Sequence, residues 1–341
     1  MSRRIAILVL LLGMAIGLQP VGLSNAPAAP VAVAAALPQQ QDATLRLDWV
    51  PGPHHIGPAL ALERGYYAAE GINLRMGEGT GSGVTVQAVA ANQDTFGFAD
   101  AGTMTTAVAR GVPVTMVANT TPRSPIGVIY LPPTAINSPQ DLSGKSIGAA
   151  AGDASLTALP AVARLNGVNP DSYRVVTIEA ATKVPALLQR RVDTIVGFRF
   201  GDYLRAWTEN PDVRIHLYAD WGVNTLGNGY ITHERTVRER PDLVRGFVRA
   251  TLRGWKDAAA DQPAGVAALL RQFPNTREDF LVAGLPMVIE HFYSDATRGH
   301  PLGWMAEQDW AQTVSVLREY GGMEGNPSMT SLYTNDFVPQ D

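Results

Sequence analysis

Several side chains that could bind a small molecule stand where expected strands end. Trp49 ends a strand expected at 44–49, and its flat face could stack on an aromatic ring, with packing in the core as the alternative. Thr80 and Ser82 lie in the glycine-rich turn 77–83. Backbone N–H groups of this turn, at a helix start, suit a carbonyl, phosphate or sulfonate oxygen. Glycine-rich turns also form where the backbone needs a positive φ, so this turn has a structural alternative.

Two aspartates precede expected helices. Asp100, with Thr103 after it, follows the strand expected at 95–99, and Asp153 follows the strand expected at 145–149. Each carboxylate could accept a hydrogen bond from a ligand N–H group, or it could cap the helix that it precedes. Asp100, Thr103 and Asp153 are therefore candidate ligand contacts, with capping as the structural alternative.

The segment 198–203 is the most individual part of the sequence. Phe198 and Tyr203 offer a stacking surface, and Arg199 could donate to a carbonyl or anionic oxygen. Core packing is the alternative for the phenylalanines. Asn228, near Asn224, could meet ligand hydroxyl groups, although Asn–Gly steps are also ordinary turn formers.

The composition excludes several kinds of chemistry. The 341 residues contain no cysteine, which excludes thiol catalysis, disulfides and cysteine-ligated metal centres. No Gly-x-Ser-x-Gly, His-Glu-x-x-His or Walker motif supports a hydrolase, a metalloprotease or an NTPase. The net charge of −4 argues against nucleic acid as a partner, and no cofactor is expected. His54 is expected at the surface, and no metal site is predicted because neither His54 nor His55 has a partner at ligand spacing.

The order of the expected elements indicates how these residues are positioned. A chain of 341 residues holds about two domains. Short strands alternate with helices as far as residue 197, and helices dominate after residue 235. The strands are expected at 44–49, 73–76, 95–99, 112–118, 127–131, 145–149, 174–178, 194–197 and 230–232, and the later helices at 241–257, 263–271, 277–289 and 307–320. This order predicts two α/β lobes, with a ligand where their strand ends face one cleft.

The N-terminus carries an export signal. Arg3 and Arg4 precede an apolar run from Ile5 to Leu18, which is short for a membrane span and typical of a signal-peptide core. Small residues follow, so residues 1–36 are expected to be a signal peptide cleaved near Ala36, with an uncleaved anchor as the alternative. The body is then exported, to the periplasm or the outer face of the cytoplasmic membrane.

Longer stretches resemble a known family. Leu47-Asp48-Trp49-Val50-Pro51, His55-x-Gly57 and the run 63–74 resemble the opening of substrate-binding proteins of the thiamine-pyrimidine-precursor, sulfonate and nitrate type. Residues 86–99 and 136–145 resemble later segments of the same family. The resemblance implies an α/β, two-lobe type 2 periplasmic-binding-protein fold with two hinge crossings, near 127–130 and 221–226. Lobe 1 would comprise 37–128 and 225–341, and lobe 2 would comprise 129–224.

The resemblance also implies a function and partners. Proteins of this type serve an ABC importer, so the partners would be a permease with its ATPase subunit and a small-molecule ligand, and we expect a monomer. In the family, Trp49 lies beside the pocket and His55 takes the position of a hydrogen-bonding group.

The ligand depends on how segment 198–203 is interpreted. Pyrimidine-precursor binders of the family carry an acidic residue there, whereas aromatic residues and Arg199 take that place here. The segment therefore resembles the riboflavin-binding branch, whose ligand has a large flat face, two ring carbonyls and a polyhydroxyl tail. The alternatives are a thiamine-precursor pyrimidine, a sulfonate, taurine or nitrate anion, and a sensor domain that captures a protein. A pyrimidine-synthesising enzyme like the eukaryotic branch is disfavoured because it would need a cysteine-rich motif.

Overall fold

The chain from residue 40 onward folds around two five-stranded sheets. The computed structural model describes residues 40–151 and 153–340, so the expected signal peptide at 1–36 lies outside the described residues. The first sheet has the order β2-β1-β3-β10-β4, in which β1 pairs parallel with β2 and β3 while β10 is antiparallel to β3 and β4. Its strands are β1 (Gln41–Arg46), β2 (Ile72–Gly77), β3 (Phe96–Asp100), β4 (Val114–Asn119) and β10 (Asn228–His233).

The second sheet repeats this arrangement. Its order is β7-β6-β8-β5-β9, with β6 parallel to β7 and β8, and β5 antiparallel to β8 and β9. Its strands are β5 (Ile126–Tyr130), β6 (Ser146–Ala149), β7 (Arg174–Thr177), β8 (Thr194–Phe198) and β9 (Arg214–Leu217). The strand β9 was not expected from the sequence, and the other strands lie within a few residues of their expected positions.

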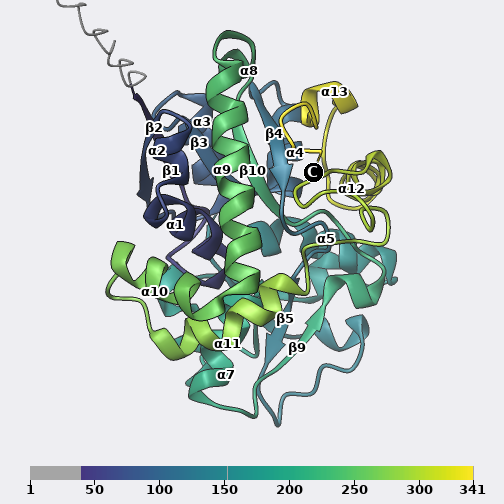
Figure 1. The fold of residues 1–341 in the computed structure, drawn as a ribbon. Coiled ribbons are helices and arrows are strands. Elements are labelled where there is room, and N and C mark those ends of the chain that lie inside the picture. The colour runs from purple at the N-terminus through teal and green to yellow at the C-terminus, as the bar shows by residue number, and fades with distance from the viewer. Residues whose placement is uncertain (1–39, 152, 341) are drawn as a thin grey trace, which may run out of the picture. The chain divides into compact units, whose positions relative to one another are not determined.

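Helices cover the sheets and supply most of the core. The longest, α9, presents a buried apolar stripe to α1 and α2, and it runs along the front of the molecule in Figure 1. The helix α10 packs against α9, α11 packs against α10, and α12 packs against both α4 and α5. The helices are α1 (Ile56–Glu63), α2 (Tyr66–Ala69), α3 (Ser82–Ala90), α4 (Ala101–Ala109), α5 (Ala154–Leu165), α6 (Lys183–Leu188), α7 (Leu204–Glu209), α8 (Glu234–Glu239), α9 (Pro241–Ala260), α10 (Gln262–Gln272), α11 (Glu278–Ile289), α12 (Glu307–Glu319) and α13 (Met329–Leu332). In the described part of the chain, none of them is both long and apolar enough to cross a membrane.

The chain passes between the two sheets twice. The first passage is 120–125, just before the expected crossing at 127–130, which instead belongs to β5. The second is 218–227, which contains the expected crossing at 221–226. The two passages are hydrogen-bonded to each other, since Gly227 N donates to Thr121 O at 2.8 Å and Ser124 N donates to Asn224 Oδ1 at 3.2 Å. The expected lobe boundaries themselves remain a prediction.

Candidate ligand-binding cleft

A small cavity lies between segments that follow strands of both sheets. Its free space is about 20 Å³, roughly what one or two water molecules occupy. The wall combines aromatic rings with carboxyl groups. It is formed by Asp48, Trp49, His54, Gly81, Ser82, Asp153, Phe198, Gly201 and Asp202. We call this space the inner cavity.

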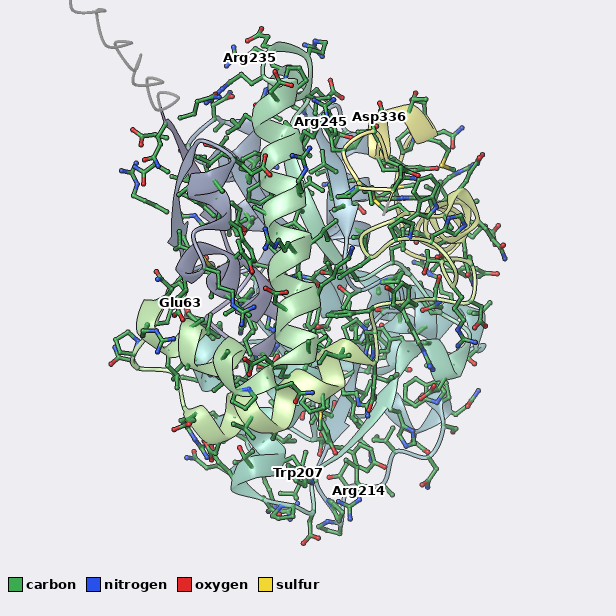
Figure 2. The ribbon with its side chains drawn as sticks, viewed as in Figure 1. Glu63, Trp207, Arg214, Arg235, Arg245 and Asp336 are labelled. Carbon is green, nitrogen blue, oxygen red and sulfur yellow. The ribbon has the colours of Figure 1, made fainter. Side chains whose placement is uncertain are left out.

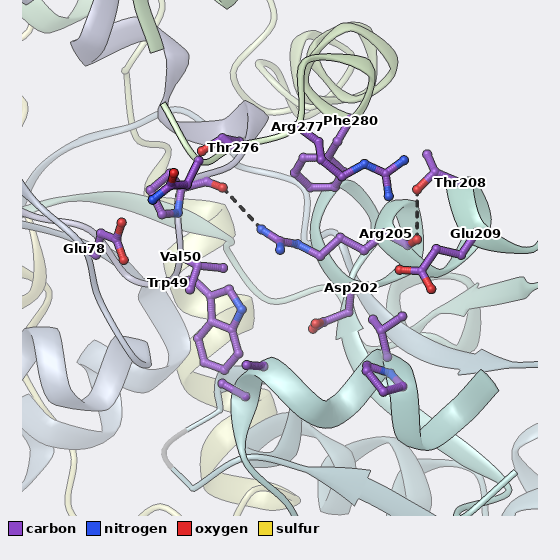
Figure 3. A pocket seen from close by; sticks show the side chains of 16 residues that line it. Trp49, Val50, Glu78, Asp202, Arg205, Thr208, Glu209, Thr276, Arg277 and Phe280 are labelled. Carbon is purple, nitrogen blue, oxygen red and sulfur yellow. Dashed lines mark hydrogen bonds between the residues drawn. The ribbon is translucent and has the colours of Figure 1, made fainter. Parts of the chain in front are cut away.

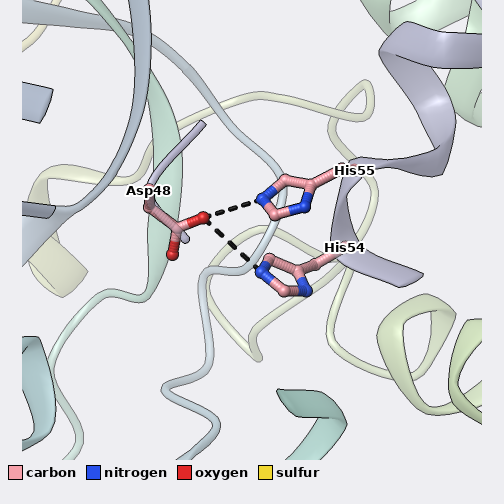
Figure 4. A group of neighbouring side chains, drawn as sticks. All are labelled: Asp48, His54 and His55. Atoms are coloured by element: carbon pink, nitrogen blue, oxygen red, sulfur yellow. Dashed lines mark hydrogen bonds and ion pairs between the residues drawn. The ribbon is translucent and has the colours of Figure 1, made fainter. Parts of the chain in front are cut away.

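The loop after β1 brings Asp48 together with two histidines (Figure 4). His55 Nδ1 accepts a hydrogen bond from Gly52 N, so its proton is on Nε2, which donates to Asp48 Oδ1 at 2.7 Å. The other carboxylate oxygen of Asp48 accepts from Asn228 Nδ2 at 2.8 Å. Burial, followed by the neighbouring His54, lowers the pKa of His55 to about 4 despite the opposing effect of Asp48, so its ring is neutral at pH 7.

His54 is buried, with 4% of its surface exposed, which corrects the expectation that it lies at the surface. It stacks on Phe198, with ring centres 6.4 Å apart, and its Nε2 lies 3.5 Å from Asp48 Oδ1. Burial alone would raise the pKa of Asp48, but its contacts with His54 and His55 outweigh burial and hold the pKa well below the ordinary value.

Asp48, His54 and His55 also have the geometry of a possible metal site, because their ligand atoms lie within 4.8 Å of one another. Spacing along the sequence did not reveal the acidic partner, Asp48, which stands seven residues before His55 in the loop after β1. His55 Nε2 carries the proton that it donates to Asp48, so a metal would have to displace that proton.

Lys183 forms a buried ionic cluster on the opposite wall. Its ammonium group pairs with Asp153 and, at 2.8 Å, with Asp202 Oδ2, and it lies 5.3 Å from the ring centre of Trp49. Burial disfavours the charged amine, but the two aspartates outweigh burial and raise the pKa of Lys183 above its ordinary value. Gly197 makes room for this cluster, because a Cβ there would lie 2.4 Å from Asp202 Oδ2.

Two helices that start at the cleft are capped by the protein's own carboxylates. Asp100 Oδ1 accepts from Thr103 N at 2.7 Å, and Asp153 Oδ1 accepts from Ser155 N at 3.0 Å. Asp100 Oδ2 is buried without a partner. Burial raises the pKa of Asp100 to about 6, and the charges of Asp48 and Asp153 add to this effect against the hydrogen bonds from Thr103.

A larger cavity opens beside the inner one, and we call it the outer cavity (Figure 3). Its volume is about 400 Å³, within the range of about 300–1,000 Å³ that is usual for sites that bind drug-sized ligands. It shares Trp49 and Asp202 with the inner cavity. Its remaining wall is mixed, because it includes polar side chains such as Arg205, Glu209 and Thr276 and apolar ones such as Val184 and Phe280.

Comparison with known proteins identifies the family. A family model described as NMT1/THI5 like matches residues 52–264. The chain belongs to this family. It is 29% identical over 327 residues to the riboflavin-binding protein RibY of Chloroflexus aurantiacus, which covers 92% of this chain and 91% of RibY. It is 27% identical over 305 residues to a 4-amino-5-hydroxymethyl-2-methylpyrimidine phosphate synthase of Legionella pneumophila, which covers 87% of this chain and 92% of that protein.

A solved structure establishes the fold of this NMT1/THI5-like protein. The alkanesulfonate-binding protein SsuA from Xanthomonas axonopodis pv. citri, bound to MOPS, superposes with a TM-score of 0.66 at 14% identity. The superposition covers 88% of this chain and 100% of SsuA. The predicted two-lobe periplasmic-binding fold with two crossings is therefore confirmed.

This NMT1/THI5-like protein brings most, but not all, of the ligand-contact candidates from its sequence together at the inner cavity. Those that line the inner cavity are Trp49, Ser82, Asp153 and Phe198, and those that support its wall are His55, Asp100, Thr103 and Asn228. Three lie elsewhere. Thr80 is exposed, Arg199 pairs with Glu290 at 3.2 Å, and Tyr203 packs against the apolar cluster around β5 and β8.

Segment 198–203 differs from its sequence interpretation in one respect. An acidic residue does stand at the cleft, because Asp202 lines both cavities, whereas Arg199 lines neither. A kinked turn over Arg199–Tyr203, with Gly201 in a non-helical conformation, produces this arrangement. The sequence contained Asp202 and Lys183, but only the fold shows that they are paired.

Proposed function

We propose that the chain is the extracytoplasmic substrate-binding component of an ABC importer and that its ligand is a flat heteroaromatic vitamin, riboflavin. One observation carries the proposal: the aromatic, acid-lined inner cavity and the larger outer cavity, whose wall offers both polar and apolar side chains, share Trp49 and Asp202. Such a pair of spaces suits a ring with N–H donors joined to a polyhydroxyl tail. The relative RibY, named as a riboflavin-binding protein, supports this ligand.

The charge at the cleft argues against a sulfonate, taurine or nitrate ligand. A helix N-terminus attracts an anion through its free N–H groups and its dipole. At α4 and α5 that position is already taken by Asp100 and Asp153. One ammonium group, that of Lys183, is shared between Asp153 and Asp202, so it does not offset these carboxyl groups for an incoming anion.

A thiamine-precursor pyrimidine is the second candidate, and Asp202 favours it. A carboxylate at this position can accept from the exocyclic amine of an aminopyrimidine, which is the pairing that Arg199 was expected to replace. An aminopyrimidine is much smaller than a flavin and would leave the outer cavity of about 400 Å³ largely empty. The size of the combined space therefore favours riboflavin.

Catalysis is not part of the proposal. A pyrimidine synthase of the eukaryotic type would use a cysteine-rich motif, and this chain has no cysteine. The imidazole of His55 is held in a buried hydrogen-bond pair with Asp48, which gives it a role in supporting the wall of the cleft.

Calorimetric titration of the purified protein tests the proposal. Riboflavin, 4-amino-5-hydroxymethyl-2-methylpyrimidine and an alkanesulfonate are titrated separately. We expect heat and saturation at a 1:1 ratio for riboflavin, weaker binding of the pyrimidine and none of the sulfonate. Micromolar or tighter binding of the pyrimidine without any response to riboflavin would transfer the assignment to the second candidate.

A further inference from the structure

Arg205 is an incompletely satisfied cation in the wall of the outer cavity. It belongs to α7, and its Nη2 donates to Pro51 O across the cleft at 3.2 Å (Figure 3). Its guanidinium carbon lies 4.7 Å from the ring centre of Phe280, which holds the group flat. Its Nε is buried without a hydrogen-bond partner.

The other charged groups of the outer cavity do not form an ion pair with the guanidinium group of Arg205. Within the described residues no carboxylate lies within ion-pair distance of it, because the nearby Asp202 is engaged with Lys183. Arg277 lines the same cavity but is paired with Asp279. Leaving a buried donor unsatisfied costs about 1–3 kcal/mol, and more for a charged group, so such a group calls for an explanation.

Hydroxyl, amide and carboxylate groups surround Arg205 in the outer cavity. They belong to Thr208, Glu209, Asn275 and Thr276. These donors and acceptors suit a chain of hydroxyl groups, each of which both donates and accepts. Trp49 lines both cavities and Phe198 lines the inner one, so a flat ring would stack on Trp49 where the two spaces meet. A ring placed there leaves the outer cavity for the hydroxylated tail.

We propose that Arg205 is a specificity-determining residue that donates to an oxygen of the ligand's polyhydroxyl tail in the outer cavity. This inference rests on the proposed function, because it assumes a ligand made of a flat ring and such a tail. It makes Arg205, rather than Arg199, the arginine that recognises the ligand.

Two ligands that differ only in the tail test this inference. Riboflavin and lumiflavin share the ring, but lumiflavin carries a methyl group in place of the tail. The dissociation constants of both are measured by flavin fluorescence for the full protein and for Arg205→Met and Arg205→Lys. The matched control is Arg214→Gln, which removes an exposed cation on β9, an edge strand of the second sheet (Figure 2).

We expect Arg205→Met to weaken riboflavin about 10- to 100-fold, the range for a hydrogen bond to a charged group, and to change lumiflavin less than about twofold. Arg205→Lys should give a smaller loss, again for riboflavin only, and Arg214→Gln no loss for either. Loss of the bond to Pro51 affects both ligands equally, so only the difference between them reports on the tail. Equal losses for both ligands, or none for either, would overturn the inference while riboflavin binding stands. Absence of riboflavin binding by the unmodified protein would instead refute the proposed function.

Discussion

The buried environment of Asp100 predicts how strongly the folding stability of the protein depends on pH. Its carboxyl group is 2% exposed, it caps α4 through Oδ1, and Oδ2 has no partner. Asp100→Asn keeps an oxygen for the cap, since asparagine is also a good N-cap residue, and it removes the titration. The groups that face Asp100 are Asp48, Asp153 and Thr103, and all of them remain in the variant.

The sign and the magnitude of the pH effect on folding stability follow from the raised pKa of Asp100. Burial first, and then the charges of Asp48 and Asp153, raise the pKa of Asp100 from 3.8 to about 6. Between these pH values the folded protein holds a proton that the unfolded chain has released, so stability contributed by Asp100 falls as pH rises. It is fully present below pH 3.8 and lost above about pH 6. At about 1.4 kcal/mol for each pH unit, the loss is about 3 kcal/mol.

Urea unfolding followed by tryptophan fluorescence at pH 4, 5, 6 and 7 measures this effect in the ligand-free protein. The free energy of unfolding of Asp100→Asn minus that of the unmodified protein should increase by about 2.4 kcal/mol between pH 4 and pH 7, most of the full effect, because the unfolded carboxyl group is already partly ionised at pH 4. Asp336→Asn, which removes one charge at an exposed position, is the control (Figure 2). A difference for Asp100→Asn that stays constant across this range would refute the assigned environment of the carboxyl group.

Three further variants probe the cleft. Lys183→Met leaves two buried carboxyl groups without their shared cation and should lower the free energy of unfolding by about 3–5 kcal/mol in urea; a loss below 1 kcal/mol would contradict the buried cluster. Trp49→Ala should weaken riboflavin binding about 3- to 10-fold in a fluorescence titration, and Trp49→Phe should recover part of it; equal losses would argue against stacking. Arg199→Gln should leave the affinity unchanged within twofold, because Arg199 pairs with Glu290 and lines neither cavity; a tenfold loss would assign the ligand contact to Arg199.

Local sequence patterns were sufficient to predict most of the strands and helices of the fold. Strand and helix signals located nine of the ten strands, because buried β-branched runs and glycine or proline breaks are local features. The long helix α9 was expected to end at residue 257 and ends at Ala260. The strand β9 has only four residues and lies at a sheet edge, so its pairing with β5 depends on tertiary contact.

The cleft was less predictable, because pairing across it is not a local property. His54 was expected at the surface, since its burial depends on Phe198 and Phe200 from the second sheet's side. Lys183 carries no local signal of its role, because it stands 30 residues from Asp153 and pairs with it only in the fold. Arg199 and Asp202 are three residues apart on a kinked turn, and only the turn's geometry decides which of them lines the cavities.

The central claim, that the cleft binds the ring of riboflavin against Trp49, is tested most directly by titrating riboflavin with the purified protein and following flavin fluorescence. We expect quenching that saturates at one riboflavin per chain, with a midpoint that shifts to higher concentration in Trp49→Ala. Flavin fluorescence that stays constant over a protein excess reaching the millimolar range would contradict the claim.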